Sequence, residues 1–411
     1  MFRRGLFYSY LAIYLRYFLA LSVTQTTLFA TLPMLLNVIF QTFVWGPVSD
    51  RFQLRRTLII RGELLAGIGT VLLWYAHTLT ENQTMAGYIL IAGLSVIEIF
   101  WSMSNVGWSA LISDIYPGKE RNAVQGRLTS IGGVGRIAGI WIGGLLYDGL
   151  GLAYEGWGFH RGALFFIASG AMFVSVLPML LVPEGGILRE KGGAQADAPD
   201  IPAGSHRIFM IFLAAMVFIN FGRNAVAVIL TPYLVLDSGF GVSSRVVSYI
   251  VNMQSVGIII TGLAMGWSSR RLGDGKTLCI GTVLAAASLL IFALCGTLPL
   301  IYVSSFLRGT SEVIIFSSAY AFASVLIPAE QRGRQFSYFN ATFFLSWGTA
   351  GTFIAGPIID YAIACGAGEM TAYRLAFFSA FILTLIGLGI LAVLLFCLLP
   401  KQHPRPAAAP L

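Results

Sequence analysis

Charged side chains are scarce in this sequence. Asp, Glu, Lys and Arg make up 11% of its 411 residues, whereas soluble domains carry about a quarter. Apolar residues make up 57%, and the mean hydropathy is +0.79. This composition excludes an ordinary soluble globular protein. It predicts a polytopic membrane protein, for which the lipid bilayer is the first partner.

Cysteine and histidine are equally rare, with four residues of each. The cysteines (Cys279, Cys295, Cys365 and Cys397) are scattered without the spacing of metal ligands, and the histidines are dispersed. We therefore expect no disulfide, no metal site and no catalytic thiol. A glycine-rich phosphate loop with lysine is also missing, which disfavours ATP-driven pumping. The sequence predicts no cofactor and no enzyme, since a membrane enzyme would need a catalytic constellation that is not present.

The sequence contains many long apolar segments. Crossing the hydrocarbon core of a bilayer takes about 20 apolar residues in a helix. The sequence therefore predicts an all-α protein with twelve transmembrane helices, whose bounds are loose by a few residues. The predicted spans are 5–22, 27–48, 57–77, 85–113, 124–148, 161–182, 207–235, 245–268, 276–297, 299–326, 334–364 and 372–399.

The net charge of +8 is distributed unevenly over the connecting segments. With both termini in the cytoplasm, the inner loops and tail hold 17 of the 26 Lys and Arg residues, and the outer loops hold only Arg161, Arg245 and Arg374. This asymmetry follows the positive-inside rule. The charge therefore describes topology and not a nucleic-acid partner. It predicts a multi-pass protein of the plasma membrane with both termini cytoplasmic.

The chain divides at a Gly/Pro/Ala-rich, charged segment, which is typical of a flexible linker. The sequences on its two sides repeat each other: Gly143-Gly144-Leu-Leu-Tyr-Asp148 corresponds to Ala355-Gly356-Pro-Ile-Ile-Asp360. We therefore predict two six-helix bundles in parallel orientation. The predicted units are an N-terminal bundle at 1–182, a cytoplasmic linker at 183–206, a C-terminal bundle at 207–400 and a cytoplasmic tail at 401–411.

A basic motif between two apolar segments is also repeated, at an offset of 220 residues (266 − 46). It occurs as Gly46-x-x-x-Asp50-Arg51-x-x-x-Arg55-Arg56 and, degraded, as Gly266-x-x-x-Arg270-Arg271-x-Gly273-Asp274-x-Lys276. It resembles the signature loop between helices 2 and 3 of the major facilitator superfamily. Gln53 stands where that family usually has glycine, and Arg270 stands where the second copy would have Asp.

The resemblance covers essentially the whole chain and implies a secondary transporter with two pseudo-symmetric halves. It implies that Asp50 and Arg51 help to latch the halves together in one state, with Asp114 as a partner of these arginines. Arg55, Arg56, Arg270 and Arg271 belong to the same gating motif. The alternative for this motif is a basic loop that only sets topology.

Helix 5 carries Gly135-x-x-x-Gly139-x-x-x-Gly143-Gly144, which resembles the antiporter motif of the same family. Ile140 replaces the proline of that motif, so the support for antiport is weak. Small residues at this interval let helices pack closely in lipid, which is sufficient to explain the glycines. Arg136 lies on the same packing face and needs a carboxylate or carbonyl partner.

The resemblance implies that helices 1, 4, 7 and 10 line a central cavity, and each carries polar side chains. A charge inside the membrane is costly unless it is paired or wet. The predicted solute-binding residues are Asn105, Asn220, Arg223, Asn224 and Arg308. Arg223 has no carboxylate within a helical turn, so an anionic solute or Glu98 is its expected partner. Helix 1 adds Arg3, Arg4 and several tyrosines.

Two intramembrane carboxylates are candidates for proton coupling. Glu98 is the only mid-membrane carboxylate predicted in the N-terminal half, where desolvation would favour its protonated form. Its alternative is structural pairing with Arg136 or Arg223. Glu312 is the second candidate, although it lies four residues from Arg308 and the two can neutralise each other.

The favoured function is alternating-access transport of a small organic solute by a monomer, with a proton or another ion as the coupling partner. The alternatives are multidrug efflux by proton antiport and, from another class, a sensor or scaffold built on a transporter fold. One irregularity concerns the first span, which is short by about 14 residues (221 − 207) against its repeat partner. This difference favours a natural start upstream of Met1.

Overall fold

The computed structural model describes residues 1–115, 118–150, 156–184, 205–326 and 332–398. Across these residues the secondary structure is helical, and no strand is present in this part of the chain. Within the described ranges, nine helices are long and apolar enough to cross a membrane, and two shorter apolar helices lie at Ile131–Tyr147 and Ala163–Met179. Together with the irregular first helix, they form the twelve-helix, all-α architecture predicted from the apolar runs.

The N-terminal half (residues 1–184) begins with a helix that contains two π-helical turns. Its second span is continuous from α2 through η3 into α3. The elements of this half are η1 (Arg4–Tyr8), α1 (Ser9–Ile13), η2 (Tyr14–Phe18), α2 (Val23–Phe40), η3 (Gln41–Trp45), α3 (Gly46–Phe52), α4 (Arg55–Thr78), α5 (Gln83–Ile115), α6 (Gly118–Tyr147), α7 (Trp157–His160) and α8 (Ala163–Met179).

The C-terminal half (residues 205–398) repeats this order, and its first span is broken into α9 and α10 by a turn at 226–229. Its elements are α9 (Ser205–Ala225), α10 (Leu230–Val235), α11 (Ser244–Leu272), α12 (Asp274–Leu294), α13 (Leu298–Leu326), α14 (Arg332–Ala350), η5 (Gly351–Ala355), α15 (Gly356–Ala364), α16 (Glu369–Val393) and η6 (Leu394–Leu398). The predicted division of the chain at 183–206 stays a prediction, since 185–204 lie outside the described residues.

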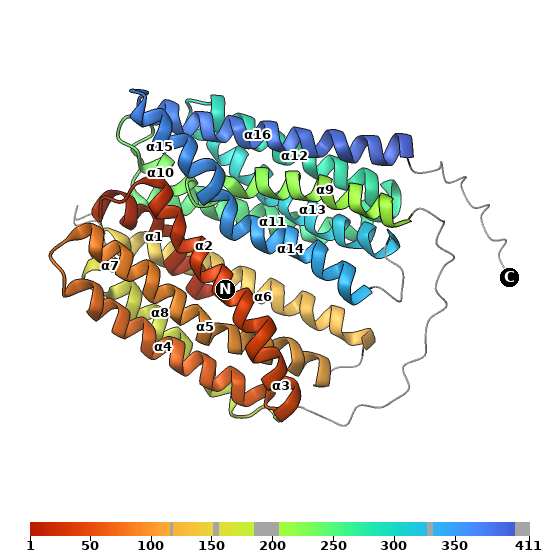
Figure 1. Cartoon of the computed structure of the whole chain (residues 1–411). Helices are drawn as coiled ribbons and strands as arrows, with labels where there is room; N and C mark the ends of the chain where they lie inside the picture. Colours follow the sequence, from red (N-terminus) through yellow and green to blue (C-terminus); the bar gives the residue numbers. More distant parts are fainter. Residues whose placement is uncertain (116–117, 151–155, 185–204, 327–331, 399–411) are drawn as a thin grey trace.

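The two halves meet along two helix pairs. In Figure 1 the N-terminal half lies below the C-terminal half, and α2 and α6 lie between them. α2 packs against α14 and α15, and α6 packs against α11. α1 and α10 also touch. Each half therefore contributes the same two spans of the repeat to the interface, which is what two similar bundles in parallel orientation produce.

Several hydrogen bonds join the halves at the end of the molecule away from residues 184 and 205, which we call the closed end. Arg16 Nη2 lies 2.7 Å from Glu369 Oε1 in an ion pair. The Tyr17 hydroxyl donates to the Pro232 carbonyl at 2.9 Å. At the same end, threonine hydroxyls of α2 contact η5. These contacts hold the halves together at the closed end.

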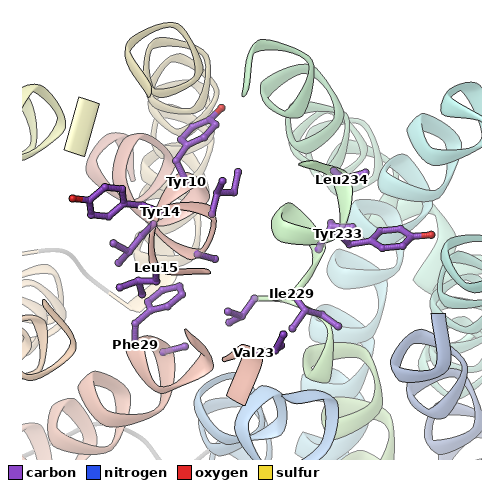
Figure 2. Close-up of a cluster of buried hydrophobic side chains, with 14 of the residues drawn as sticks. Tyr10, Tyr14, Leu15, Val23, Phe29, Ile229, Tyr233 and Leu234 are labelled. Atoms are coloured by element: carbon purple, nitrogen blue, oxygen red, sulfur yellow. The ribbon is translucent and has the colours of Figure 1, made fainter. Parts of the chain in front are cut away.

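An apolar cluster lies beside these bonds. Figure 2 shows side chains from α1, η2 and α2 facing side chains around α10. Its labelled members include Tyr10 and Phe29 from one half and Ile229 and Tyr233 from the other, and all four are almost fully buried. Because one cluster draws on both halves, separating them here would expose a large apolar area to water.

Candidate functional site

A cavity of about 330 Å³ lies between the two halves. Its wall draws on the first helix, α2, α5 and α6 of one half and on α9, α10, α11, α12, α13 and α14 of the other. Its volume falls near the lower end of the range of small-molecule sites. The lining includes Arg4, Tyr8, Phe29, Met34, Glu98, Arg136, Arg223, Asn224, Thr231, Gln254, Ser288, Arg308, Ser311, Glu312 and Trp347.

Charged side chains are concentrated in this wall. Among the described residues, four arginines line it against two glutamates, which leaves two arginines in excess. They are Arg4, Arg136, Arg223 and Arg308, with Glu98 and Glu312. Charges this deep in a membrane protein are costly unless they face water or a partner, and the cavity supplies such a space. The site is therefore positively charged and suited to an anion.

Arg223 is held in the wall by a short chain of hydrogen bonds. Its Nε donates to Asn220 Oδ1 at 3.0 Å, and Asn220 Nδ2 donates to the Thr342 hydroxyl at 3.0 Å. Its guanidinium carbon also lies 5.6 Å from the centre of the Phe343 ring, within the range of a cation–π contact. These contacts fix one edge of the guanidinium, and its two terminal nitrogens have no hydrogen-bond partner among the described residues.

Glu312 lies among three arginines. Arg136, Arg223 and Arg308 all act on its charge, and Gln254 Nε2 donates to its Oε2 at 2.8 Å. Among the described ion pairs within 4.0 Å, none joins Glu312 to Arg308. The two residues therefore share an electrostatic environment without forming the tight structural pair that the sequence left open.

Glu98 has different neighbours from those expected. Asn37 Nδ2 donates to its Oε1 at 2.9 Å, and the side chain is 6% exposed. Arg4 is the arginine that interacts with it electrostatically, and Arg4 itself lies over the Trp101 ring at 4.5 Å. Glu98 therefore contacts α2 through Asn37 and interacts with Arg4 of the first helix, whereas Arg136 and Arg223 act on Glu312.

Two of the asparagines predicted to bind the solute do not line the cavity. Asn220 is fully buried and holds Arg223. Asn105 lies seven residues beyond Glu98 on α5, about 10 Å along the helix axis, and is not a lining residue. Asn224 does line the cavity, where its Nδ2 donates to the Ser346 hydroxyl at 2.9 Å. Of the two α5 residues predicted to act in the site, Glu98 lines the cavity and Asn105 does not.

Sequence reasoning missed two lining side chains. Arg136 was assigned to the packing face of its helix, yet it lines the cavity. Its position among glycines obscured this, although a lone charge in an apolar run was a usable signal. Gln254 on α11 orients Glu312. It carries no charge and lies on a helix that was not expected to line the cavity, so nothing in the sequence marked it.

The gating motif forms the turn between α3 and α4. Gln53 adopts a left-handed conformation (φ 54°), which explains why glycine suits this position. Arg55 is 7% exposed and donates to the Ser49 hydroxyl. Arg56 lies 3.2 Å from Glu184. Arg51 is exposed at the end of α3, which begins at Gly46, and Arg271 is exposed at the end of α11. The side chains of Asp50, Asp114 and Arg270 lie outside the described residues, so the latch stays a prediction.

The glycines of the fifth predicted span lie on α6 and let this helix approach two neighbours closely. A Cβ at Gly139 would lie 3.0 Å from the backbone nitrogen of Leu6, and one at Gly143 would lie 2.7 Å from the Leu6 carbonyl oxygen. Gly144 faces the other half, since its Cβ would lie 2.9 Å from the Ser244 carbonyl oxygen. The site of a Cβ at Gly135 is less crowded, 3.6 Å from the backbone nitrogen of Phe2. These approaches place α6, and with it Arg136, close to the first helix.

Comparison with known proteins agrees with this architecture. The family model of the Major Facilitator Superfamily matches residues 1–239 and 212–411. The multidrug resistance protein MdtG of Rahnella sp. (strain Y9602) is 23% identical over 84% of this chain and 77% of its own length.

The galactose-proton symporter of Escherichia coli (strain K12) is 25% identical over 37% of this chain, and the match spans only 32% of the symporter. In three dimensions, the chain resembles a bacterial homologue of the human lysosomal transporter Spinster in an inward-facing, unoccupied conformation. The TM-score is 0.68 and the identity 15%, over 96% of this chain and 93% of that one.

Proposed function

Since this chain belongs to the major facilitator superfamily, we propose that it is a secondary active transporter that moves a small organic anion across the plasma membrane. The observation that carries this proposal is the excess of two arginines in the wall of the central cavity. A guanidinium presents a planar fork that matches a carboxylate or phosphate with two hydrogen bonds. An anion in the cavity would therefore offset the cost of holding these charges away from bulk water.

Transport proceeds by alternating access of a rocker-switch kind, in which the two halves tilt around the solute. With both termini in the cytoplasm, the hydrogen bonds and apolar cluster of the closed end would face outward. The structure would then correspond to an inward-facing state. Moving to the opposite state requires the closed end to open and the end that bears Asp50 and Arg51 to close.

A proton is the proposed coupling ion. Glu98 and Glu312 are the two carboxylates in the cavity wall, and each interacts with an arginine that a bound anion would also attract. Protonation of either carboxylate would release its arginine to the solute. The relative named as a galactose-proton symporter supports this kind of coupling.

Multidrug efflux by proton antiport is the second candidate. The relative named MdtG covers 84% of this chain, and Phe29, Met34 and Trp347 give the cavity an apolar side. An apolar wall would suit a lipophilic drug, whereas the arginines would repel a cationic one. The charge of the cavity therefore favours the anion over the cationic drugs.

The test is a comparison of solute classes on the full-length protein in proteoliposomes. Organic acids, sugars, amino acids and lipophilic cations are offered one class at a time, with a pH gradient imposed and with none. Uptake of organic acids alone supports the proposal, and movement of lipophilic cations alone supports multidrug efflux. Binding without movement of any class would support a sensor or scaffold instead.

A further inference from the structure

The arginine cluster around Glu312 is built from both halves of the molecule. Arg136 lies on α6 in the N-terminal half, while Arg223 on α9 and Arg308 on α13 lie in the C-terminal half. All three act on the charge of Glu312. Three guanidiniums and one carboxylate leave two positive charges in this part of the cavity.

The carboxylate does not occupy the hydrogen-bonding groups of these arginines. Glu312 is bonded by Gln254, and it lies in no ion pair within 4.0 Å among the described residues. The guanidiniums of Arg136 and Arg308 have no hydrogen-bond partner in the described part of the chain, yet their nitrogens are not among its buried unpaired atoms. They therefore face the cavity and can donate to a solute.

The opposite side of the cavity carries charge of both signs, since Met1 and Arg4 line it together with Glu98. Glu98 and Arg4 interact with each other, one negative charge against one positive. Around Glu312 the local count is clearer, because Arg136, Arg223 and Arg308 face this one carboxylate and leave two positive charges. A ligand that displaces water from this cluster would balance its charge fully if it carries two negative charges.

We propose that the solute is a small dianion, bound by Arg136 from one half and by Arg223 and Arg308 from the other. This inference rests on the proposed transport of an anion and specifies its charge. The required chemistry, two negative charges within a molecule that fits about 330 Å³, is shared by a short dicarboxylate and a phosphate monoester. Arg136 becomes a specificity-determining residue, and the bound solute bridges the two halves.

The test measures binding to the purified full-length protein by isothermal titration at pH 7 and constant ionic strength. The probes are succinate, its half-amide succinamate, glycerol 3-phosphate and glycerol. Succinate and succinamate have nearly the same size and differ by one charge. We expect the preferred dianion to bind about tenfold more tightly than succinamate, because a charge-assisted hydrogen bond contributes roughly that factor. Glycerol should not bind.

Variants of the full-length protein test whether the tighter binding of a dianion depends on the arginine cluster around Glu312. Arg136→Gln should remove the preference for the dianion while succinamate binding remains. Arg136→Lys retains the charge and should retain the preference at lower affinity, which distinguishes a binding role from a packing defect. Arg161→Gln, which changes an exposed arginine outside the cavity, should leave all affinities unchanged.

Each outcome decides between the proposals. Stronger binding of succinate indicates that the solute is a dicarboxylate, and stronger binding of glycerol 3-phosphate indicates that it is a phosphate ester. Equal affinities for succinate and succinamate, with glycerol 3-phosphate binding no more tightly than either, would overturn the dianion and leave anion transport standing. Retention of the full preference by Arg136→Gln would overturn the bridging role. Failure of every anion to bind would overturn both proposals together.

Discussion

Asp360 in α15 accepts a 2.9 Å hydrogen bond from the backbone N–H of Thr24, so a carboxylate of the C-terminal half caps a helix of the N-terminal half. Its other carboxylate oxygen accepts from the N–H of Val23 at 3.0 Å. The first N–H groups of a helix have no partner within that helix, and the N-terminus carries a partial positive charge. Asp360 therefore stabilises α2 through its charge as well as its hydrogen bonds.

The repeat places a second carboxylate in the equivalent position. Asp148, which corresponds to Asp360, accepts a hydrogen bond from the hydroxyl of Ser244, the first residue of α11. Each half thus contributes an aspartate, Asp148 just after α6 and Asp360 within α15, that reaches the start of an interface helix of the other half. The reciprocal contacts explain how two similar bundles are held together at the closed end without a disulfide.

Replacing Asp360 with alanine should destabilise the closed end. The substitution leaves the N–H groups of Val23 and Thr24 without their acceptor, and the loss of a helix cap costs about 1 kcal/mol. We expect the apparent melting temperature of the purified protein to fall by about one to two degrees, since the unfolding entropy of a chain of this length is large. Asp237→Ala is the matched control, since Asp237 is an exposed aspartate in a loop at the same end. An equal fall in both variants would contradict the capping role.

Asp148 predicts a pH dependence of stability. Burial raises the pKa of Asp148, although the hydrogen bond from Ser244 acts in the opposite direction. A raised pKa means that the folded protein binds this proton more tightly than the unfolded chain does. The stabilisation is complete below the ordinary aspartate pKa of about 3.9 and is lost as the pH rises through the higher folded value.

Asp148→Asn should remove this contribution, because the amide does not titrate and can still accept from Ser244. We expect the melting temperature of the variant, relative to that of the original protein, to rise with pH across this window. Thermal unfolding at a series of pH values from 4 upward measures the difference. A difference that does not change with pH would show that Asp148 does not titrate in the window.

The fold could be predicted almost entirely because its two signals are strong. Each span needs a long apolar run. The recurrence of Asp148 as Asp360 indicates that the two halves have the same sequence of helices in the same orientation. What the runs do not reveal is local irregularity. The π-helical turns of the first helix and the break at 226–229 depend on packing between helices, to which an apolar run is insensitive.

Which of the predicted site residues line the cavity depends on how conspicuous each residue is in the sequence. Arg223, Arg308 and Glu312 stand out because a charge is rare in an apolar run, and all three line the cavity. An asparagine is less informative, since it can satisfy its hydrogen bonds inside a bundle, as Asn220 does. Helical periodicity gives a face but not a depth, so Asn105 was assigned to the cavity although it lies beyond it.

Asp50→Asn should cripple transport while the protein still inserts and folds. Asp50 is the only carboxylate among the arginines of the first copy of the motif, and the amide would remove the charge on which the predicted latch depends. Uptake into proteoliposomes, normalised to the amount of folded protein, measures the effect. A normal rate at normal expression would reject the gating role and leave the loop with a role in topology alone.

Arg223→Ala should abolish solute binding, and Arg223→Lys should weaken it. Lysine keeps the charge but loses the planar fork and the hydrogen bond from Nε to Asn220. Counterflow in proteoliposomes reports binding and exchange without a gradient. Arg207→Ala, an exposed arginine of the same helix, is the control and should transport normally. If Arg223→Ala transports normally as well, the anion proposal falls and the drug-efflux candidate gains support.

Glu98→Gln should spare counterflow but remove the dependence of uptake on a pH gradient. A carboxamide keeps the hydrogen bond from Asn37 through its oxygen, so the cavity retains its shape, but it cannot carry a proton. Parallel assays of counterflow and gradient-driven uptake separate these two effects, and Glu81→Gln in an exposed loop serves as the control. If Glu98→Gln still concentrates solute on a pH gradient, the proton is carried elsewhere. Glu312→Gln should then show the uncoupled behaviour, because Glu312 is the other carboxylate of the cavity wall.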